Sequence, residues 1–519
     1  MIVQKASFFI SHCDEMGSVN LVAMPIRDEE YDLSDIYLAT VQILPAPVPI
    51  TWSNTKLLSR AEGSQVAGHG ASNYPCISGS GNFVAFTSKA KDLDGDINQD
   101  ALFPLGQVLG LGAVYRVDTA TLEVELASRS QYQTDPFPNA AMSTADPTLG
   151  AVGRVISWFG EVVVFQGAPS NWTFTGLSGN AVEQVFVTNF LSPVQPTPRT
   201  DLVTQWFDDN LFQNRPGTGR ARGASIASGS SVQDFSLCIA LSSVATEYDP
   251  DHNATEDVFF TTYDLTGPSL GDLRKIEGFN GVPPNGASYL PVVDGADQHI
   301  AFLSNATNYT NPASDADGNQ FVDVYLFHRD VSIPGCFFKN VPAGVFEECH
   351  LQLMTRDCAD EQANAASSCP DVALDGLYVS YQSSATNLID PLQDVESAPD
   401  TNGVLDVFQT GLKPKFVRGD VDQDSSAPGL PQIGQTDAIV ILNWLFLGGP
   451  RPNCVDAADA DDDGTVNVSD PSYLLNYAFS GGQAPAQPFP ACGFDPTDDC
   501  LSCRGRDLDM CGQFGIHEH

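Results

Sequence analysis

Six short segments of the 519-residue chain share one apolar pattern, an Ile or Val followed by Tyr or Phe. They are Ile36-Tyr-Leu38, Val114-Tyr-Arg116, Val185-Phe-Val187, Val258-Phe-Phe260, Val324-Tyr-Leu326 and Val407-Phe-Gln409, at spacings of 78, 71, 73, 66 and 83 residues. A second apolar segment precedes each of the last five: Phe83-Val-Ala-Phe86, Val162-Val-Val-Phe165, Leu237-Cys-Ile-Ala240, His299-Ile-Ala-Phe302 and Leu377-Tyr-Val-Ser380. Short β-branched and aromatic runs that recur at similar intervals, without helical periodicity between them, predict a mostly β fold built from repeats.

The best-formed repeat runs from Pro75-Cys-Ile-Ser78 through Phe83-Val-Ala-Phe86 to Ala90. This segment resembles the repeats of TolB-like β-propellers. The resemblance covers residues 30–412 and implies a six-bladed propeller over 1–413, with a β-sandwich array as the alternative. The first repeat lacks its opening strands, so a truncated first blade and an incomplete start are expected.

Acidic loops precede the Val-Phe/Tyr segment in three of the repeats. They carry Asp or Asn at positions 1, 3, 5 and 9: Asp92, Asp94, Asp96 and Asp100; Asp249, Asp251, Asn253 and Asp257; Asp315, Asp317, Asn319 and Asp323. This spacing is similar to the calcium hairpins of integrin-type propellers, whose alternate carboxylates converge on one ion. The alternative is an Asx-turn without metal, and it is favoured for a fourth copy that has Ala398 before Asp400, Asn402 and Asp406.

A longer acidic loop occupies residues 459–470, and it has the spacing of an EF-hand loop. Asp459, Asp461 and Asp463 fill positions 1, 3 and 5, Gly464 supplies the turn, and Thr465, Asn467 and Asp470 hold positions 7, 9 and 12. An apolar helix is expected to follow and to end at Gly481-Gly482. An earlier copy begins with Asp420, Asp422 and Asp424, reaches its position 12 at Asp437 after an insertion, and ends at Gly448-Gly449.

A duplicated calcium loop, each copy followed by one helix, resembles the dockerins, and Cys492-Gly-Phe-Asp-Pro-Thr-Asp-Asp499 resembles the end of a bacterial subgroup. The resemblance implies a calcium-binding module over 414–505, followed by a tail at 506–519. It also implies a cohesin-like or cell-surface protein partner and binding through Asn443, Trp444, Asn476 and Tyr477. These residues differ from the Ser-Thr and Lys-Arg pairs through which cellulosomal dockerins recognise their partners, which leaves the identity of the partner open.

The charge and residue composition of the chain argue against binding to nucleic acid or membranes. With 24 Lys and Arg against 65 Asp and Glu, the formal charge is −41, which disfavours binding to nucleic acid or anionic membranes. There is no apolar run long enough for a membrane span. The twelve Cys are best explained by disulfides, which places the protein outside the cell or on its surface, although no signal peptide is visible.

The sequence contains no motif that identifies a catalytic site, and we predict no catalytic residue. Glu161 and Glu183 are the only carboxylates we considered as a glycosidase pair. His69 and His252 are expected to be solvated loop residues. Two hypotheses follow: a secreted, non-catalytic binding protein attached through its dockerin, or a secreted glycoside hydrolase or polysaccharide lyase that carries one.

Overall fold

A computed structural model represents the 519 residues of the chain. It describes residues 19–27, 34–42, 51–61, 63–90, 92–94, 111–129, 140–145, 153–170, 172–174, 177–178, 181–191, 198–208, 213–227, 236–248, 255–265, 267, 269–295, 297–310, 317–329, 351–357, 361–373, 376, 378–389, 400, 402–411, 416–422, 433–490, 493, 495, 497, 501 and 503. The chain divides into two compact units. Unit 1 comprises Met1–Leu353 and Ser368–Gly376, and unit 2 comprises Met354–Ser367 and Leu377–His519. The expected domain boundary at 413/414 lies outside the described residues and stays a prediction.

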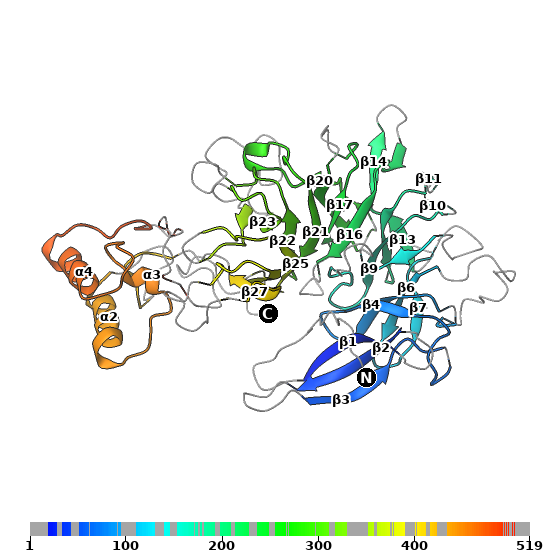
Figure 1. The fold of residues 1–519 in the computed structure, drawn as a ribbon, viewed down its shortest axis with the longest axis horizontal. Helices are drawn as coiled ribbons and strands as arrows, with labels where there is room; N and C mark the ends of the chain where they lie inside the picture. The colour runs from blue at the N-terminus through cyan, green and yellow to red at the C-terminus, as the bar shows by residue number, and fades with distance from the viewer. Residues whose placement is uncertain are drawn as a thin grey trace. The chain divides into compact units, whose positions relative to one another are not determined.

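Unit 1 consists of antiparallel sheets whose strands follow one another in chain order (Figure 1). The first sheet has three strands, β1 (Val19–Arg27), β2 (Ser34–Gln42) and β3 (Thr51–Leu57). The second is β4 (Ser72–Ile77), β5 (Phe83–Ser88), β6 (Ala113–Asp118) and β7 (Val124–Leu126). The third is β8 (Met142–Ser143), β9 (Val162–Gly167), β12 (Gln184–Asn189) and β13 (Arg199–Leu202).

The fourth sheet is β16 (Ala221–Ile226), β17 (Ser236–Ser243), β18 (Asp257–Asp264) and β19 (Ser269–Leu270), with β20 (Arg274–Lys275) also paired to β18. The fifth is β21 (Ser288–Val293), β22 (His299–Ser304), β23 (Asp323–His328) and β24 (Leu351–Leu353). Unit 1 also has two small hairpins, β10 (Thr173–Phe174) with β11 (Leu177–Ser178) and β14 (Gln205–Asp208) with β15 (Gln213–Pro216), and Phe279–Gly281 form a short 3₁₀ turn.

The predicted apolar segments are neighbouring strands within each sheet. Phe86 of β5 lies opposite Tyr115 of β6, and Phe165 of β9 lies opposite Phe186 of β12, so the register brings the aromatic residues of the two segments together. Their rings stack with centroids 6.0 and 5.8 Å apart. The prediction of a mostly β chain is confirmed, and the order of the sheets is compatible with a β-propeller.

Each sheet of unit 1 packs against the next sheet along the chain. β4 contacts β1 and β2, β8 contacts β5 and β6, β16 contacts β9 and β12, and β21 contacts β16, β17 and β18. All six residues of β9 and of β12 are buried. Because both faces of these strands are covered, their apolar residues, Val162–Phe165 of β9 and Val185–Val187 of β12, are consecutive and do not alternate with polar ones.

A serine turn recurs at the end of the second strand in four repeats. Its hydroxyl accepts the backbone N–H of an alanine two residues later, and the pairs are Ser88 with Ala90, Ser243 with Ala245, Ser304 with Ala306 and, in unit 2, Ser383 with Ala385. Two residues beyond each alanine, the side chain of Asp92, Glu247, Asn308 or Asn387 accepts the backbone N–H of His69, Thr218, Asn285 or Asn364. These matching hydrogen bonds show that the repeats are equivalent in three dimensions.

The first strands of the sheets share a bulge. The register of β4 with β5, of β16 with β17 and of β21 with β22 shifts at the same point. The third residue of each first strand has a left-handed φ: 55° at Tyr74, 62° at Gly223 and 52° at Leu290. Cys369, the third residue of β25 (Ser367–Val372), has a φ of 50°. A bulge bends a strand and increases its twist, and its recurrence gives the first strands one shape.

One arginine joins the first strands, in what we call the Arg154 junction (Arg154, Ser225, Val293 and Val372). Its guanidinium donates from Nη1 to the carbonyl of Val293 at 2.8 Å and from Nη2 to the carbonyl of Val372 at 3.1 Å. The carbonyl of Arg154 accepts the Ser225 hydroxyl at 3.2 Å, and this hydroxyl accepts the N–H of Val293 at 3.1 Å. Residues of four repeats therefore meet at one partly buried hydrogen-bonded cluster.

Replacement of Arg154 by Ala is expected to destabilise unit 1 by about 2–4 kcal/mol, because two buried carbonyls lose charged donors. Arg220→Ala is the control, since the Arg220 side chain is 42% exposed and pairs with Glu183; it should cost less than about 1 kcal/mol. Denaturant unfolding of the full chain measures both. Equal losses in the two variants would show that Arg154 does not join the sheets.

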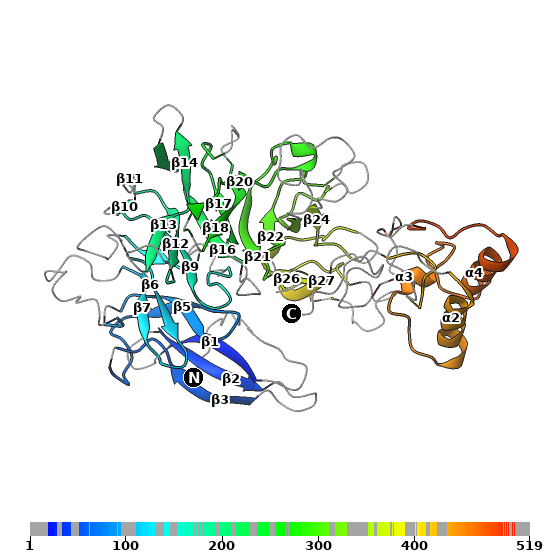
Figure 2. The ribbon, with the colours of Figure 1, turned by 180° about the vertical axis from the view of Figure 1, so that it is seen from behind.

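Unit 2 holds a hairpin and the helices. β26 (Tyr378–Ser383) pairs with β27 (Asp406–Gly411), and Figure 2 labels both. The helices are α2 (Gln435–Leu447), α3 (Val455–Ala458) and α4 (Ser469–Ser480). Val421, Ile441, Ala458, Ala460 and Leu474 form their shared core, and a disulfide joins Cys454 to Cys503. No helix in the described ranges is long and apolar enough to cross a membrane.

Candidate functional site

The loop between α3 and α4 gathers three carboxylates. Oxygen atoms of Asp459, Asp461 and Asp463 lie within 4.8 Å of one another. Gly464 has a φ of 78°, and its N–H donates to Asp459 Oδ2 at 2.8 Å, while the N–H of Asp463 donates to Asp459 Oδ1 at 3.3 Å. The sharp turn that the sequence predicts at Gly464 therefore closes the loop around Asp459.

Asp470, the predicted ligand at position 12, lies at the start of α4, outside this group of three. Its carboxylate accepts the N–H of Ala460 at 2.9 Å and the N–H of Asn467 at 2.8 Å. Asn467 donates from Nδ2 to the carbonyl of Thr465 at 3.1 Å. Asp470 thus joins the loop to α4 through these two hydrogen bonds. Thr465 and Asn467 lie in the part of the loop between Asp463 and Asp470.

The first copy repeats the hydrogen bonds of Asp470, but its group of three contains the residue at position 12 in place of the one at position 5. Asp420, Asp422 and Asp437 form the second group of carboxylates within 4.8 Å. Asp437 accepts the N–H of Val421 at 2.8 Å and of Gly434 at 2.8 Å, the positions equivalent to Ala460 and Asn467. Asp424 lies outside the described residues. α2 and α4 end alike, because Gly448 and Gly481 each have a φ of 70° and donate to the carbonyls of Asn443 and Asn476.

The electrostatics of both groups suit a divalent cation. Burial raises the pKa of Asp437 and of Asp470 to about 6. The pKa of Asp461 is raised by burial and then by the nearby charges of Asp463 and Asp459. Asp461 Oδ1 is buried and has no hydrogen-bond partner among the described residues. Crowded carboxylates with an unused oxygen are the ligands that a hard cation such as Ca²⁺ prefers, so these residues fit the predicted ion.

A buried arginine that sequence analysis did not identify supports the second loop. Arg418 is fully buried, and its guanidinium pairs with Asp456 at 3.1 Å, Asp462 at 2.9 Å and Asp495 at 2.5 Å. It also donates to the carbonyl of Asp459 at 2.9 Å. The Arg-Gly-Asp order at 418–420 gives no indication of this role. Arg418 joins the loop at 459–470 to the segment that contains Asp495.

Arg418→Met is expected to destabilise the helical module by about 3–5 kcal/mol, because three largely buried carboxylates lose their counter-ion. Arg451→Met is the control, since Arg451 belongs to the same module and is exposed. Denaturant unfolding of the full chain, followed by helical circular dichroism in excess calcium, measures the difference. A variant as stable as the control would contradict the role of Arg418.

The predicted partner-binding residues lie on α2 and α4. Asn476 is exposed, and Asn443, Trp444 and Tyr477 are half-buried. The ring of Tyr477 meets the ring of Phe489 edge to face at 5.5 Å. The most exposed apolar side chains were not predicted, and they include the equivalent pair Phe446 and Phe479, at 63% and 68% exposure. Both lie two residues before the Gly-Gly pair of their copy, and this repetition could have identified them from the sequence.

The acidic loops of unit 1 are described only in part. Asp94 accepts the N–H of Leu126 at 2.8 Å, and Asp317 accepts the hydroxyl of Tyr325 at 2.5 Å. Asp92, Asp257, Asn319 and Asp323 are also described, whereas Asp96, Asp100, Asp249, Asp251, Asn253 and Asp315 are not. Within the described ranges the two groups in unit 2 are the only clusters of three or more potential metal ligands. Calcium in the loops of unit 1 therefore stays a prediction.

The copy with Ala398 has the hydrogen bonds of a turn. Asp400 Oδ1 accepts the N–H of Asn402 at 3.1 Å, and Asn402 Nδ2 donates to Asp406 Oδ2 at 2.8 Å. Ala398 itself is not described. These contacts are those of the Asx-turn that the sequence favours for this copy.

Glu161 and Glu183 do not form a pair. Glu161 precedes β9 and accepts the Ser157 hydroxyl at 2.7 Å. Glu183 pairs with Arg220 at 2.6 Å and with Gln166 near the other end of β9 at 3.0 Å. A six-residue strand separates them by about 17 Å, beyond the reach of a glycosidase pair. His69 contacts Asp92 at 2.5 Å and is exposed, and His252 lies outside the described residues.

Fold and site define a mostly β protein of repeated antiparallel sheets with a helical, acid-rich module. No protein-family model matches the chain. No curated protein matches it either.

Solved structures that are weakly similar to the chain include two enzymes and a β-propeller domain. Acylaminoacyl peptidase from Pyrococcus horikoshii is 7% identical with a TM-score of 0.32, over 77% of this chain and 45% of the peptidase, so the chain spans under half of it. A thermostable family-43 glycoside hydrolase is 12% identical with a TM-score of 0.27, over 63% and 91% of the two chains. A β-propeller domain from Myceliophteria thermophila is 11% identical with a TM-score of 0.24, over 55% and 62%. Similarities of this size assign neither a family nor an activity.

Proposed function

We propose that this chain is a secreted, non-catalytic binding protein with a calcium-dependent attachment module. In this proposal the sheets form a six-bladed propeller that presents a ligand-binding surface, and the helical module is a dockerin-like tether. The observation that carries the proposal is the duplication in unit 2, where two groups of carboxylates share one hydrogen-bonding scheme and two matching helices. Chance would not reproduce the same contacts twice.

Calcium would be held in the second loop by Asp459, Asp461, Asp463 and Asp470, together with Thr465 and Asn467. In the first loop it would be held by Asp420, Asp422, Asp424 and Asp437. The ion would supply the positive charge that offsets carboxylates packed within 4.8 Å of one another. Arg418 would add to the effect of the ion, because its guanidinium pairs with Asp462 of the second loop and offsets the charge of that carboxylate.

The attachment surface would lie on α2 and α4. Asn443, Trp444, Asn476 and Tyr477 are its predicted members, and the exposed rings of Phe446 and Phe479 extend it. Exposed apolar side chains at equivalent places in two copies favour a protein partner, either cohesin-like or on the cell surface. The symmetry of the copies would allow two opposite orientations of the partner.

Two further observations support the rest of the proposal. The serine turns and the packing of consecutive sheets in unit 1 favour a propeller. The Cys454–Cys503 disulfide favours an extracellular location. The enzyme hypothesis loses the one carboxylate pair considered for it, because Glu161 and Glu183 lie at opposite ends of β9.

Calcium titration of the chelator-treated full chain tests the proposal. Helical circular dichroism should rise as calcium binds, because the loops close and the helices order. Asp461→Asn should weaken the second site about tenfold or more, since the number of charged ligands sets the affinity of calcium loops.

Asp118→Asn is the matched control, because Asp118 caps a turn of unit 1 by accepting two backbone N–H groups. Isothermal titration calorimetry should give the wild-type affinity for this control. A chain whose helical signal ignores calcium, or an Asp461→Asn variant that binds as tightly as the control, would overturn the proposal.

A further inference from the structure

The Val-Phe/Tyr strands of the six repeats differ in how their first apolar residue is covered. In five of them this residue is fully buried: Ile36, Val114, Val185, Val258 and Val324. Its equivalent in β27, Val407, is 74% exposed. Val404 and Leu405, just before β27, are exposed as well. The sixth repeat therefore has an open apolar edge where the other repeats have a covered one.

An outer strand covers this position in the first three sheets, and it does so in one way. An apolar residue of the outer strand donates its N–H to the carbonyl of the Ile or Val, at 2.8–2.9 Å. The hydroxyl of the next residue, Ser or Thr, accepts the N–H of the same Ile or Val, at 2.9–3.2 Å. The pairs are Leu58-Ser59 on Ile36, Ala127-Ser128 on Val114 and Val203-Thr204 on Val185.

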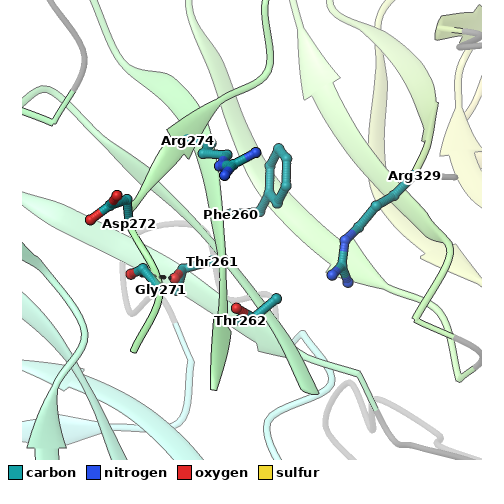
Figure 3. A pocket seen from close by; sticks show the side chains of 7 residues that line it. All are labelled: Phe260, Thr261, Thr262, Gly271, Asp272, Arg274 and Arg329. Carbon is teal, nitrogen blue, oxygen red and sulfur yellow. Dashed lines mark hydrogen bonds between the residues drawn. The ribbon is translucent and has the colours of Figure 1, made fainter. Parts of the chain in front are cut away.

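The fourth and fifth sheets have an outer strand at the same place. In the fourth, Arg274 of β20 pairs with Phe260 of β18, and Figure 3 shows the two side chains next to each other. Ile276, which follows β20, donates its N–H to the carbonyl of Val258 at 2.9 Å. In the fifth sheet β24 pairs with β23.

β27 has no such neighbour in the part of the chain that the structure describes, where it pairs with β26 alone. The chain does not return to it, because Phe416, the next described residue, donates to the carbonyl of Gly493 in the helical module at 2.9 Å. Edge strands are commonly protected by Lys, by Pro or by a bulge. β27 has the sequence Asp-Val-Phe-Gln-Thr-Gly and an unbroken register, so it has none of these. Its edge is a template for one more strand.

The five outer strands also indicate the charge of the segment that fits. Each has an arginine within it or within three residues after it, although the chain has only 24 Lys and Arg in total; these are Arg60, Arg129, Arg199, Arg274 and Arg356. Residues 400–411 contain Asp400 and Asp406 and no basic residue. A basic segment is therefore attracted to this edge, whereas a second copy of the chain, with a charge of −41, is repelled.

We propose that β27 binds an extended, basic segment of a partner protein, which adds to the sheet as the outer strand of the sixth repeat. The segment would have an aliphatic residue, then Ser or Thr, then Arg, and its first two residues would make the two hydrogen bonds to Val407. Addition of a strand to an exposed sheet edge is an established mode of peptide recognition. The inference goes beyond the proposed attachment through α2 and α4 and does not involve the carboxylate groups of the calcium loops.

A peptide with the sequence of residues 54–61, Asn-Thr-Lys-Leu-Leu-Ser-Arg-Ala, tests the proposal. Fluorescence anisotropy of the labelled peptide with the full chain, in buffer with chelator, should show saturable binding. The matched peptide with Leu58→Pro lacks the N–H that would donate to the carbonyl of Val407, so it should bind at least about tenfold more weakly. Equal binding of the two peptides, or no binding at millimolar concentration, overturns the proposal.

Val407→Lys tests the site itself, because it adds the charge that repels a basic segment and its side chain is exposed in the fold. It should weaken binding of the peptide about tenfold. Leu191→Lys is the matched control, since Leu191 is 71% exposed in unit 1, and it should leave the affinity unchanged. Equal affinities in the two variants overturn the site.

Sedimentation of the full chain separates this proposal from self-association. A chain that forms dimers, loses them in Val407→Lys and does not bind the peptide would identify a second copy as the occupant and overturn the proposal. Peptide binding without a calcium response of the helices would overturn only the attachment function. A calcium response without peptide binding would overturn only this inference.

Discussion

The carbonyl groups at the ends of the first strands have to be satisfied where the sheets of unit 1 meet. Buried carbonyls without donors are costly, and a strand at the edge of a sheet has such groups on one side. Arg154 supplies two donors from one side chain, to Val293 and to Val372, while its own carbonyl accepts the hydroxyl of Ser225. A long cationic side chain can reach across repeats that share no backbone ladder, and Arg154 joins their first strands in this way.

The helical module meets a similar constraint with the opposite sign of charge. Its loops bring together carboxylates that repel one another, and burial adds to this by disfavouring their ionised forms. Arg418 offsets one side of the second loop through Asp456, Asp462 and Asp495. In our proposal calcium offsets the other side. A strongly acidic chain can keep these carboxylates close together because Arg418 and, in our proposal, calcium offset their negative charge.

Local patterns were sufficient for the strands and the acidic loops. The Val-Phe/Tyr segments are strands because β-branched and aromatic residues suit a buried, pleated ladder. The grouping of Asp459, Asp461 and Asp463 follows from alternate residues around the turn at Gly464. Patterns failed where a contact joins distant residues. Arg418 and Asp495 are 77 residues apart, and Arg154 and Val372 are 218 apart, so no local periodicity relates them. Exposure of Phe446 and Phe479 was missed for a related reason, because an apolar helix residue is expected in a core.

Residue pattern alone was enough to establish the repeats, the β class and the duplicated acidic loops, because each depends on neighbours within a few positions. The fold alone established the bulges, the Arg154 junction and the open edge of β27. The bulges illustrate the reason. Tyr74, Leu290 and Cys369 adopt a left-handed φ that none of these residue types favours, and Gly223 adopts it at the equivalent place. Such strain persists only where the surrounding structure imposes it, and here neighbouring strands and sheets impose the same bend on four different residues.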